Sequence, residues 1–115
     1  MSTSTQSSQL PTTIRDFLTA HAARDVDSAL RAFDDHAVVT DEGQTYRGTD
    51  EVVRFLRDAG AQFSYTTELV GVERLDDARW VVTNRIEGNF PGGTADLRYR
   101  FVMEHDLITE LVIAP

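Results

Sequence analysis

The order of its periodic patterns constrains this chain most. Apolar residues recur every three or four positions through the first sixty residues, and every second position from residue 63 almost to the end. The first spacing is typical of helices with one buried face, and the second of half-buried strands. We therefore predict an α+β fold, in which three N-terminal helices pack on a curved, mainly antiparallel sheet and form a cone with an internal pocket.

Three apolar stripes define the predicted helices. Pro11 and Thr13 mark the start of the first helix, Asp25 lies at the break before the second, and Thr49 caps the third, which Gly60 ends. A short apolar run over 37–39 and a loop or tight turn over 41–48 separate the second helix from the third. The stripes are Ile14, Phe17, Leu18, His21 and Ala22; Val26, Ala29, Leu30 and Phe33; and Val52, Val53, Leu56 and Ala59.

Four alternating segments, 63–70, 80–88, 95–104 and 107–113, are predicted strands. The connections between them are short, which predicts an antiparallel meander. One face of this sheet is predicted to line the pocket. The opposite face mixes charges with valines and is predicted to be a homodimer surface, although a solvated face is the alternative; its residues are Glu68, Arg85, Glu87, Arg98 and Arg100 with Val70, Val72, Val81 and Val102.

Length and composition narrow the function classes. The 115 residues predict one domain over 11–115, after a disordered tail over 1–10 that is neither a signal peptide nor a membrane segment. A net charge of −8 argues against nucleic acid or an anionic membrane as partner. The absence of cysteine fits a reducing cytoplasm. The three histidines lack zinc spacing and no glycine-rich phosphate loop occurs, so we expect no metal and no cofactor.

The sequence resembles the nuclear-transport-factor-2-like superfamily over residues 11 to 114. The similarity is carried by Phe33–Val39, by Asp41–Gly43, by Tyr46–Gly48 before a helix, and by a meander that contains Leu97–Phe101 and Leu107–Leu111. The superfamily includes SnoaL-like polyketide cyclases and ketosteroid isomerases. It also includes dehydratases, hydrolases and non-catalytic binding modules, so the resemblance implies the fold without fixing the function.

The comparison with ketosteroid isomerase is the most specific. Asp41 matches the position of the catalytic base in that family, but Phe17 and Leu97 stand where its two oxyanion donors would be. Loss of one such donor costs about 2.7–4 kcal/mol of transition-state stabilisation. Steroid isomerisation is therefore not expected.

The candidate catalytic residues are Asp41, His21 and Tyr46, and each has two interpretations. Asp41 is either a buried general base or a turn residue whose carboxylate bonds to the backbone. His21 either packs in the core or donates into the pocket, and Tyr46 either gates the pocket mouth or covers the core. The predicted substrate-binding wall consists of Phe17, Tyr65, Trp80, Asn84, Leu97 and Tyr99. The aromatic members also have a purely structural alternative, and Asn84 needs a hydrogen-bond partner wherever it is buried.

Two functional hypotheses follow. The first is a cofactor-independent isomerase, cyclase or lyase that uses acid–base chemistry on a small apolar carbonyl or cyclic compound. The second is a non-catalytic small-molecule-binding or dimerisation module with the same pocket. The environment of Asp41 discriminates between them, because a base must be buried and must reach the pocket space.

Overall fold

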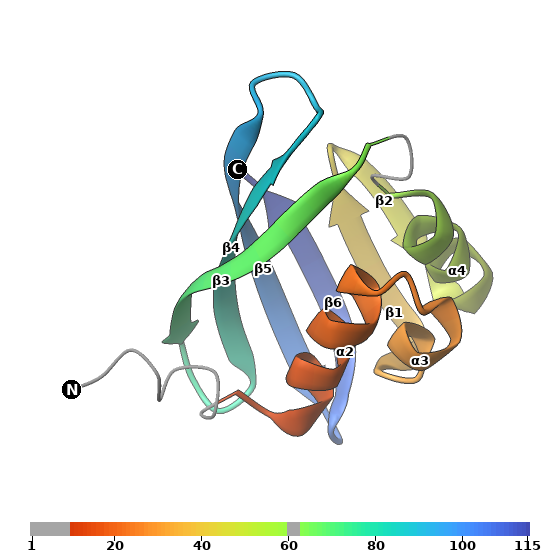
Figure 1. Ribbon diagram of the computed structural model, residues 1–115. Coiled ribbons are helices and arrows are strands. Elements are labelled where there is room, and N and C mark those ends of the chain that lie inside the picture. Colours follow the sequence, from red (N-terminus) through yellow and green to blue (C-terminus); the bar gives the residue numbers. More distant parts are fainter. Residues whose placement is uncertain (1–9, 60–62) are drawn as a thin grey trace.

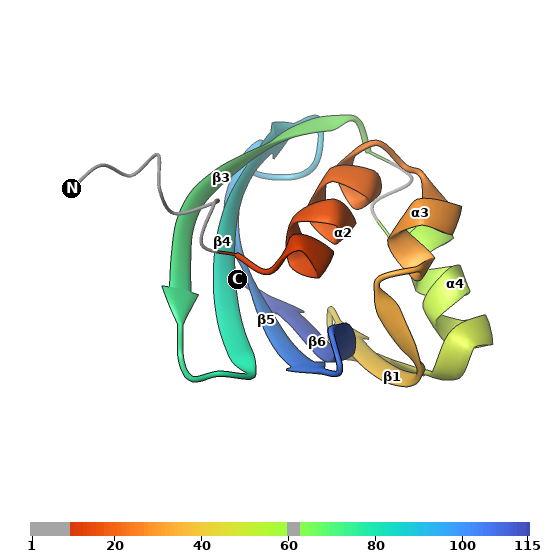
Figure 2. The same ribbon diagram turned by 90° about the horizontal axis from the view of Figure 1, so that it is seen from below.

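The structure, a computed structural model, describes residues 10–59 and 63–115. In these residues three helices lie on the concave side of a curved, six-stranded sheet (Figure 1). Figure 2 shows α2 lying within the curve of the sheet, with α3 and α4 beyond it on the β1 side. The elements are α2 (Thr12–Ala22), α3 (Val26–Leu30), β1 (Phe33–Asp41), β2 (Gln44–Arg47), α4 (Gly48–Asp58), β3 (Tyr65–Arg74), β4 (Arg79–Gly88), β5 (Thr94–Glu104) and β6 (Leu107–Ala114).

The strand order in the sheet is β2-β1-β6-β5-β4-β3. Strands β3 to β6 pair as an antiparallel meander, and β1 joins that meander through a parallel ladder with β6. The predicted α+β architecture of helices on a curved, mainly antiparallel sheet is confirmed. The core is the layer between the concave face and the helices, where Ile14, Phe17 and Phe101 are fully or almost fully buried.

The segment before α4 is a hairpin, which corrects the expectation of a loop over 41–48. Strands β1 and β2 pair directly, and the turn between them consists of Glu42 and Gly43, with φ values of 53° and 79°. Two consecutive residues with positive φ form the tight turn that matches the twist of a hairpin. Phe33, which was expected to belong to the second helix, is the first residue of β1.

The first turn of α4 is also held differently from the prediction. The Arg47 amide donates to the Glu51 carboxylate at 2.7 Å, while the Thr49 hydroxyl donates to the Asp35 carbonyl rather than capping the helix. The predicted end of this helix at Gly60 lies outside the described residues.

A β-bulge in β3 reverses the expected facing of one valine. The register against β4 shifts between Leu69 and Gly71, so Val70 is an extra residue. Because side chains alternate strictly along a strand, one extra residue moves the following ones to the other face. Val72 therefore lies opposite the buried Val82 and packs against the core, not on the outer face.

The ends of the first helix also differ in detail from the sequence pattern. Leu10, assigned to the predicted tail, is only 4% exposed and belongs to the core, whereas the rest of that tail lies outside the described residues. Ala22, assigned to the apolar stripe, is exposed because α2 ends there. No helix in the described part of the chain is both long enough and apolar enough to cross a membrane.

Candidate functional site

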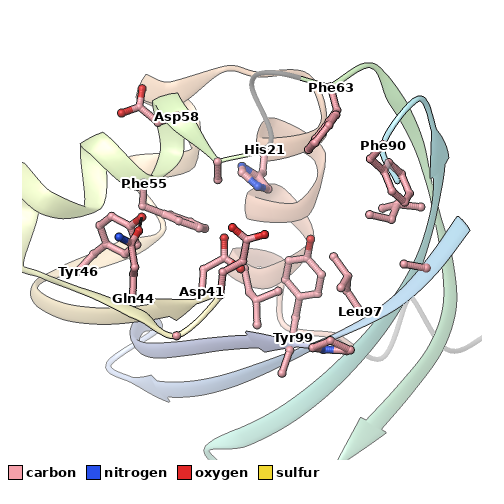
Figure 3. Close-up of a pocket in the computed structure, with 18 of the residues that line it drawn as sticks. His21, Asp41, Gln44, Tyr46, Phe55, Asp58, Phe63, Phe90, Leu97 and Tyr99 are labelled. Carbon is pink, nitrogen blue, oxygen red and sulfur yellow. Dashed lines mark hydrogen bonds between the residues drawn. The ribbon is translucent and has the colours of Figure 1, made fainter. Parts of the chain in front are cut away.

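A cavity of about 1320 Å³ lies between the concave face of the sheet and the helices (Figure 3). Its wall combines the last turn of α2, the β1–β2 hairpin, one side of α4, and the inner faces of β3 to β6. Aromatic rings make up much of this wall. They belong to Tyr46, Phe55, Phe63, Tyr65, Phe90 and Tyr99.

Asp41 is the last residue of β1 and points into the cavity (Figure 3). Its side chain is half-buried, and burial, together with the neighbouring charge of Glu42, raises the pKa of its carboxyl to about 6. The positive φ angles of Glu42 and Gly43 account for the turn, so the turn does not require the Asp41 carboxylate. The group is therefore available to a ligand and is partly ionised near neutral pH.

His21 lies in the last turn of α2, between two aromatic rings. Its ring is stacked on Phe17, with centroids 5.4 Å apart, and on Phe55, with centroids 5.6 Å apart. Burial, and to a smaller extent the charge of Arg24, lowers the pKa of His21 to about 4. The imidazole is thus neutral near pH 7, a form in which one nitrogen donates and the other accepts a hydrogen bond.

Tyr99 projects from β5 into the same space as Asp41 and His21 (Figure 3). Burial raises the pKa of Tyr99 to about 12, with smaller contributions in the same direction from Tyr65 and Asp41. A hydrogen bond from the Asn84 amide to the Tyr99 oxygen acts in the opposite direction. Asn84, on β4, is the only buried polar or charged side chain among the described residues.

Arg24 does not line the cavity but contacts two residues that do, Ala59 and Tyr65, and no sequence signal marked it. It follows α2 with a φ of 60°, and its guanidinium donates to the Ala59 carbonyl and, at 3.3 Å, to the Tyr65 hydroxyl. The same guanidinium lies 5.6 Å from the centre of the Tyr65 ring. This contact ties the ends of α2 and α4 to β3.

Six of the nine predicted site residues line the cavity together. They are Asp41, His21, Tyr46, Tyr65, Leu97 and Tyr99. Tyr46 lies at the hairpin, where its hydroxyl donates to the Gln44 side chain at 2.8 Å and its ring packs on Phe55.

The other three predicted residues, Phe17, Trp80 and Asn84, are not part of the cavity wall. Phe17 is 0% exposed because the rings of Phe33 and Phe101 cover it edge-on. Trp80 lies near the start of β4 and packs under the guanidinium of Arg74. Asn84 contacts Tyr99 instead.

Sequence reasoning missed several aromatic wall residues. Phe55 lies beside Val52 and Leu56 in the apolar stripe of α4, and this position was a signal that could have identified it. Phe63 and Phe90 were not among the predicted wall residues, but both line the cavity and pack against each other with centroids 6.0 Å apart. Within residues 10–59 and 63–115, no group of three or more His, Cys, Asp or Glu side chains is placed to hold a metal ion.

Comparison with known proteins gives the family. Residues 14–111 match the model of the SnoaL-like domain. The chain belongs to the SnoaL-like family. A comparison of this SnoaL-like protein with curated proteins gives no match.

Solved structures share the fold of this SnoaL-like protein. A putative polyketide cyclase from Sinorhizobium meliloti is 29% identical with a TM-score of 0.87, and the match covers 95% of this chain and 99% of that one. A hypothetical protein with a ketosteroid isomerase-like fold from Catenulispora acidiphila, in complex with trimethylamine, is 11% identical with a TM-score of 0.79, over 93% and 87% of the two chains. A Mycobacterium tuberculosis protein in complex with estradiol-17β-hemisuccinate is 14% identical with a TM-score of 0.73, over 90% and 91%.

Proposed function

We propose that this SnoaL-like protein is a cofactor-independent acid–base isomerase, cyclase or lyase for a small apolar carbonyl or cyclic compound. The observation that carries the proposal is the environment of Asp41, a half-buried carboxyl that faces a cavity with six Phe and Tyr side chains in its wall. A general base is most effective when its pKa lies near the working pH, and the Asp41 pKa of about 6 meets that requirement.

The proposed chemistry begins with proton abstraction. The Asp41 carboxylate takes a proton from a carbon next to a carbonyl group, and the electron pair of the C–H bond moves onto the carbonyl oxygen to give an enolate. Neutral His21 is the proposed donor that polarises this oxygen, whereas the Tyr46 hydroxyl at the hairpin already donates to the Gln44 side chain. In an isomerisation, the protonated Asp41 then returns the proton to a carbon that is conjugated with the enolate, and the carbonyl group re-forms. In a cyclisation, the enolate carbon instead attacks a second carbonyl carbon of the same molecule, the π bond of that carbonyl breaks, and its oxygen takes the proton from Asp41.

The structural neighbours support a small-molecule occupant. One is a putative polyketide cyclase, and two others are complexes with an estradiol derivative and with trimethylamine. We propose that the aromatic side chains of this cavity hold an apolar ligand, because flat rings bury apolar surface and also direct edges and faces at a ligand.

The test combines binding with turnover. Wild type and Asp41→Asn are screened by thermal shift against small cyclic ketones, enones and polyketide-like aromatics, and each binder is then analysed for product by mass spectrometry and NMR. We expect Asp41→Asn to keep binding and to lose turnover, while Asp58→Asn, at the rim of the same cavity, keeps both. Binding without turnover in the wild type would instead establish the second hypothesis, a non-catalytic binding module.

We also propose a homodimer formed through the outer face of the sheet. Half-buried Val81, Val102 and Val112 alternate there with Arg98, Arg100 and Glu110. A two-fold axis through this face would bury the valines and place charges of opposite sign opposite one another. For location we propose the cytoplasm, since a chain of 115 residues without cysteine folds without disulfide bonds.

A further inference from the structure

Asp41 and Tyr99 occupy one row across three neighbouring strands. Asp41 on β1 pairs with Ile113 on β6, and Tyr99 on β5 pairs with the same Ile113 from the other side. All three side chains line the cavity, so they share the concave face. Two strand spacings separate the backbones of Asp41 and Tyr99 by about 10 Å. The curvature of the sheet directs their side chains toward the same space (Figure 3).

Asn84 lies next to Tyr99 on the inner face of the sheet, because it pairs with Leu97 of β5, two residues before Tyr99. A tyrosine hydroxyl has one proton to donate and lone pairs that accept. An Asn84 amide that donates to the Tyr99 oxygen uses a lone pair and leaves the phenolic proton for another acceptor. Asn84 is the only buried polar side chain in the described residues, and an amide in such a place requires a partner. Its position beside Tyr99 is one from which it can orient the Tyr99 hydroxyl.

The other two tyrosines of the cavity differ from Tyr99. Tyr46 donates its proton to the Gln44 side chain, so that proton is already used. Tyr65 lies on the edge strand β3, where Arg24 fixes its hydroxyl near the ends of α2 and α4. Of the three tyrosines, Tyr99 is thus the one whose hydroxyl faces Asp41, with Ile113 of β6 between them.

We propose that Tyr99 donates a hydrogen bond to an acceptor oxygen of the ligand, and that Asn84 is the positioning residue for this donor. The inference deepens the proposed function and rests on it for the kind of ligand. Ile113 forms the floor between the two groups, so a ketone that lies over it presents its oxygen to Tyr99 and an adjacent C–H bond to Asp41. The favoured occupant is then an uncharged cyclic ketone, because a ligand carboxylate would lie beside Asp41.

The test uses two probes that differ only at the oxygen. These are 1-tetralone, whose carbonyl accepts but cannot donate, and tetralin, which has a CH₂ group in its place. The ratio of their dissociation constants cancels changes in general packing. We expect the wild type to prefer tetralone, and Tyr99→Phe to lose about five- to tenfold of that preference while its affinity for tetralin stays unchanged. The matched control, Thr83→Val, removes a hydroxyl from β4 outside the cavity wall and should keep the preference.

Two further measurements distinguish a role of Asn84 in positioning the Tyr99 hydroxyl from a purely structural role. Asn84→Leu keeps the Tyr99 hydroxyl but removes its partner, and we expect a partial loss of the tetralone preference with unchanged affinity for tetralin. The infrared carbonyl stretch of bound tetralone should lie lower in the wild type than in Tyr99→Phe, because a hydrogen bond weakens the C=O bond. An unchanged stretch and an unchanged tetralone preference in Tyr99→Phe would overturn the inference, as would a wild type that shows no preference for tetralone.

This outcome is independent of the turnover test. If Tyr99 determines tetralone preference but no compound is converted, the proposed enzyme function fails and the donor role stands in a binding module. If turnover depends on Asp41 while Tyr99→Phe leaves the ketone preference intact, the enzyme function stands and the donor role fails.

Discussion

At the scale of single residues, the site combines two groups whose pKa values are shifted in opposite directions. Burial raises the pKa of Asp41 to about 6 and lowers that of His21 to about 4. Both shifts have the same cause, since a desolvated side chain disfavours its charged form whatever the sign. Near pH 7 the cavity therefore holds a largely ionised carboxylate and a neutral imidazole, which is the arrangement that a base and an uncharged donor require.

The raised pKa of Asp41 predicts a pH-dependent stability difference. The folded state binds the Asp41 proton more tightly than the unfolded chain does, so the wild type loses stability as pH rises from 3.8 through about 6. Asp41→Asn removes this loss. The quantity to compare is the free energy of unfolding of Asp41→Asn minus that of the wild type. After allowance for solvent screening of a half-buried group, we expect this difference to be about 1 kcal/mol more positive at pH 8 than at pH 4.

Urea unfolding at pH 4 and pH 8 measures this difference, with Asp16→Asn on the exposed face of α2 as the matched control. A pH-independent difference between wild type and Asp41→Asn would contradict the raised pKa.

The lowered pKa of His21 predicts its titration directly. Its folded pKa lies below the unfolded value of 6.5, so the stability linked to neutral His21 is complete above pH 6.5 and is lost as pH falls toward 4. In a proton NMR titration, the His21 ring resonances, assigned by their absence in His21→Asn, should shift with a midpoint near 4. A midpoint near 6.5 would show that the ring is open to water.

Sequence reasoning identified which titratable residues matter but not how they are arranged. Asp41 stood out because it matches the position of the catalytic base in ketosteroid isomerases, and His21 because it lies in the apolar stripe of a predicted helix. The stacking of His21 between Phe17 and Phe55, and the contact of Asn84 with Tyr99, join residues from different elements. Such contacts depend on strand register and on the approach of helix to sheet, and no local pattern records either.

At the scale of elements, the β1–β2 turn determines where Asp41 ends its strand. Gly43 has a φ of 79°, and a Cβ added there would meet no atom within 4 Å. We expect Gly43→Ala to cost about 1–2 kcal/mol of unfolding free energy from the backbone alone, because this conformation disfavours any residue with a Cβ.

Gly71→Ala is the matched control for the turn. Its added Cβ would lie 3.7 Å from the Thr83 side chain, an ordinary contact, and its φ is not in the left-handed region. Thermal or urea unfolding of both variants tests the prediction, and equal stabilities would contradict it.

The sequence predicted least well those elements whose conformation or alternating pattern depends on a single residue. The bulge at Val70 reverses the facing of Val72, and nothing in the run from Glu68 to Glu73 announces an extra residue. The β1–β2 hairpin was hidden for another reason. Its outward position Val38 is apolar like its inward neighbours, so the alternation that signals a strand is absent from its centre.

At the scale of the whole molecule, the change of period from helix to strand was enough to predict the architecture. Three amphipathic helices can bury their stripes only against a sheet with one apolar face, and the meander offers one such face. The sequence did not predict that β1 joins the sheet in parallel beside β6, because that ladder connects two segments far apart in the chain.

The outer face of the sheet gives a prediction at this same scale. Val112 lies on β6, near the middle of the strand order, with Arg100 and Thr40 as its neighbours in register. If this face forms the proposed dimer, the wild type should sediment as a dimer and Val112→Asp as a monomer, since an aspartate would be buried without a partner. Asp27→Ala, on the exposed surface of α3, should leave the dimer intact. A monomeric wild type in sedimentation velocity would rule out the proposed dimer.

The central position of β6 also bears on the order of folding. Strands β3 to β6 are connected by short turns, so their ladders can form early and locally. The ladder between β1 and β6 closes a loop that spans most of the chain, and contacts of that kind form slowly. Asp41 lies on β1 and Tyr99 on the meander, so the two sides of the cavity belong to units that form at different times during folding. The cavity is then among the last features of the molecule to become complete.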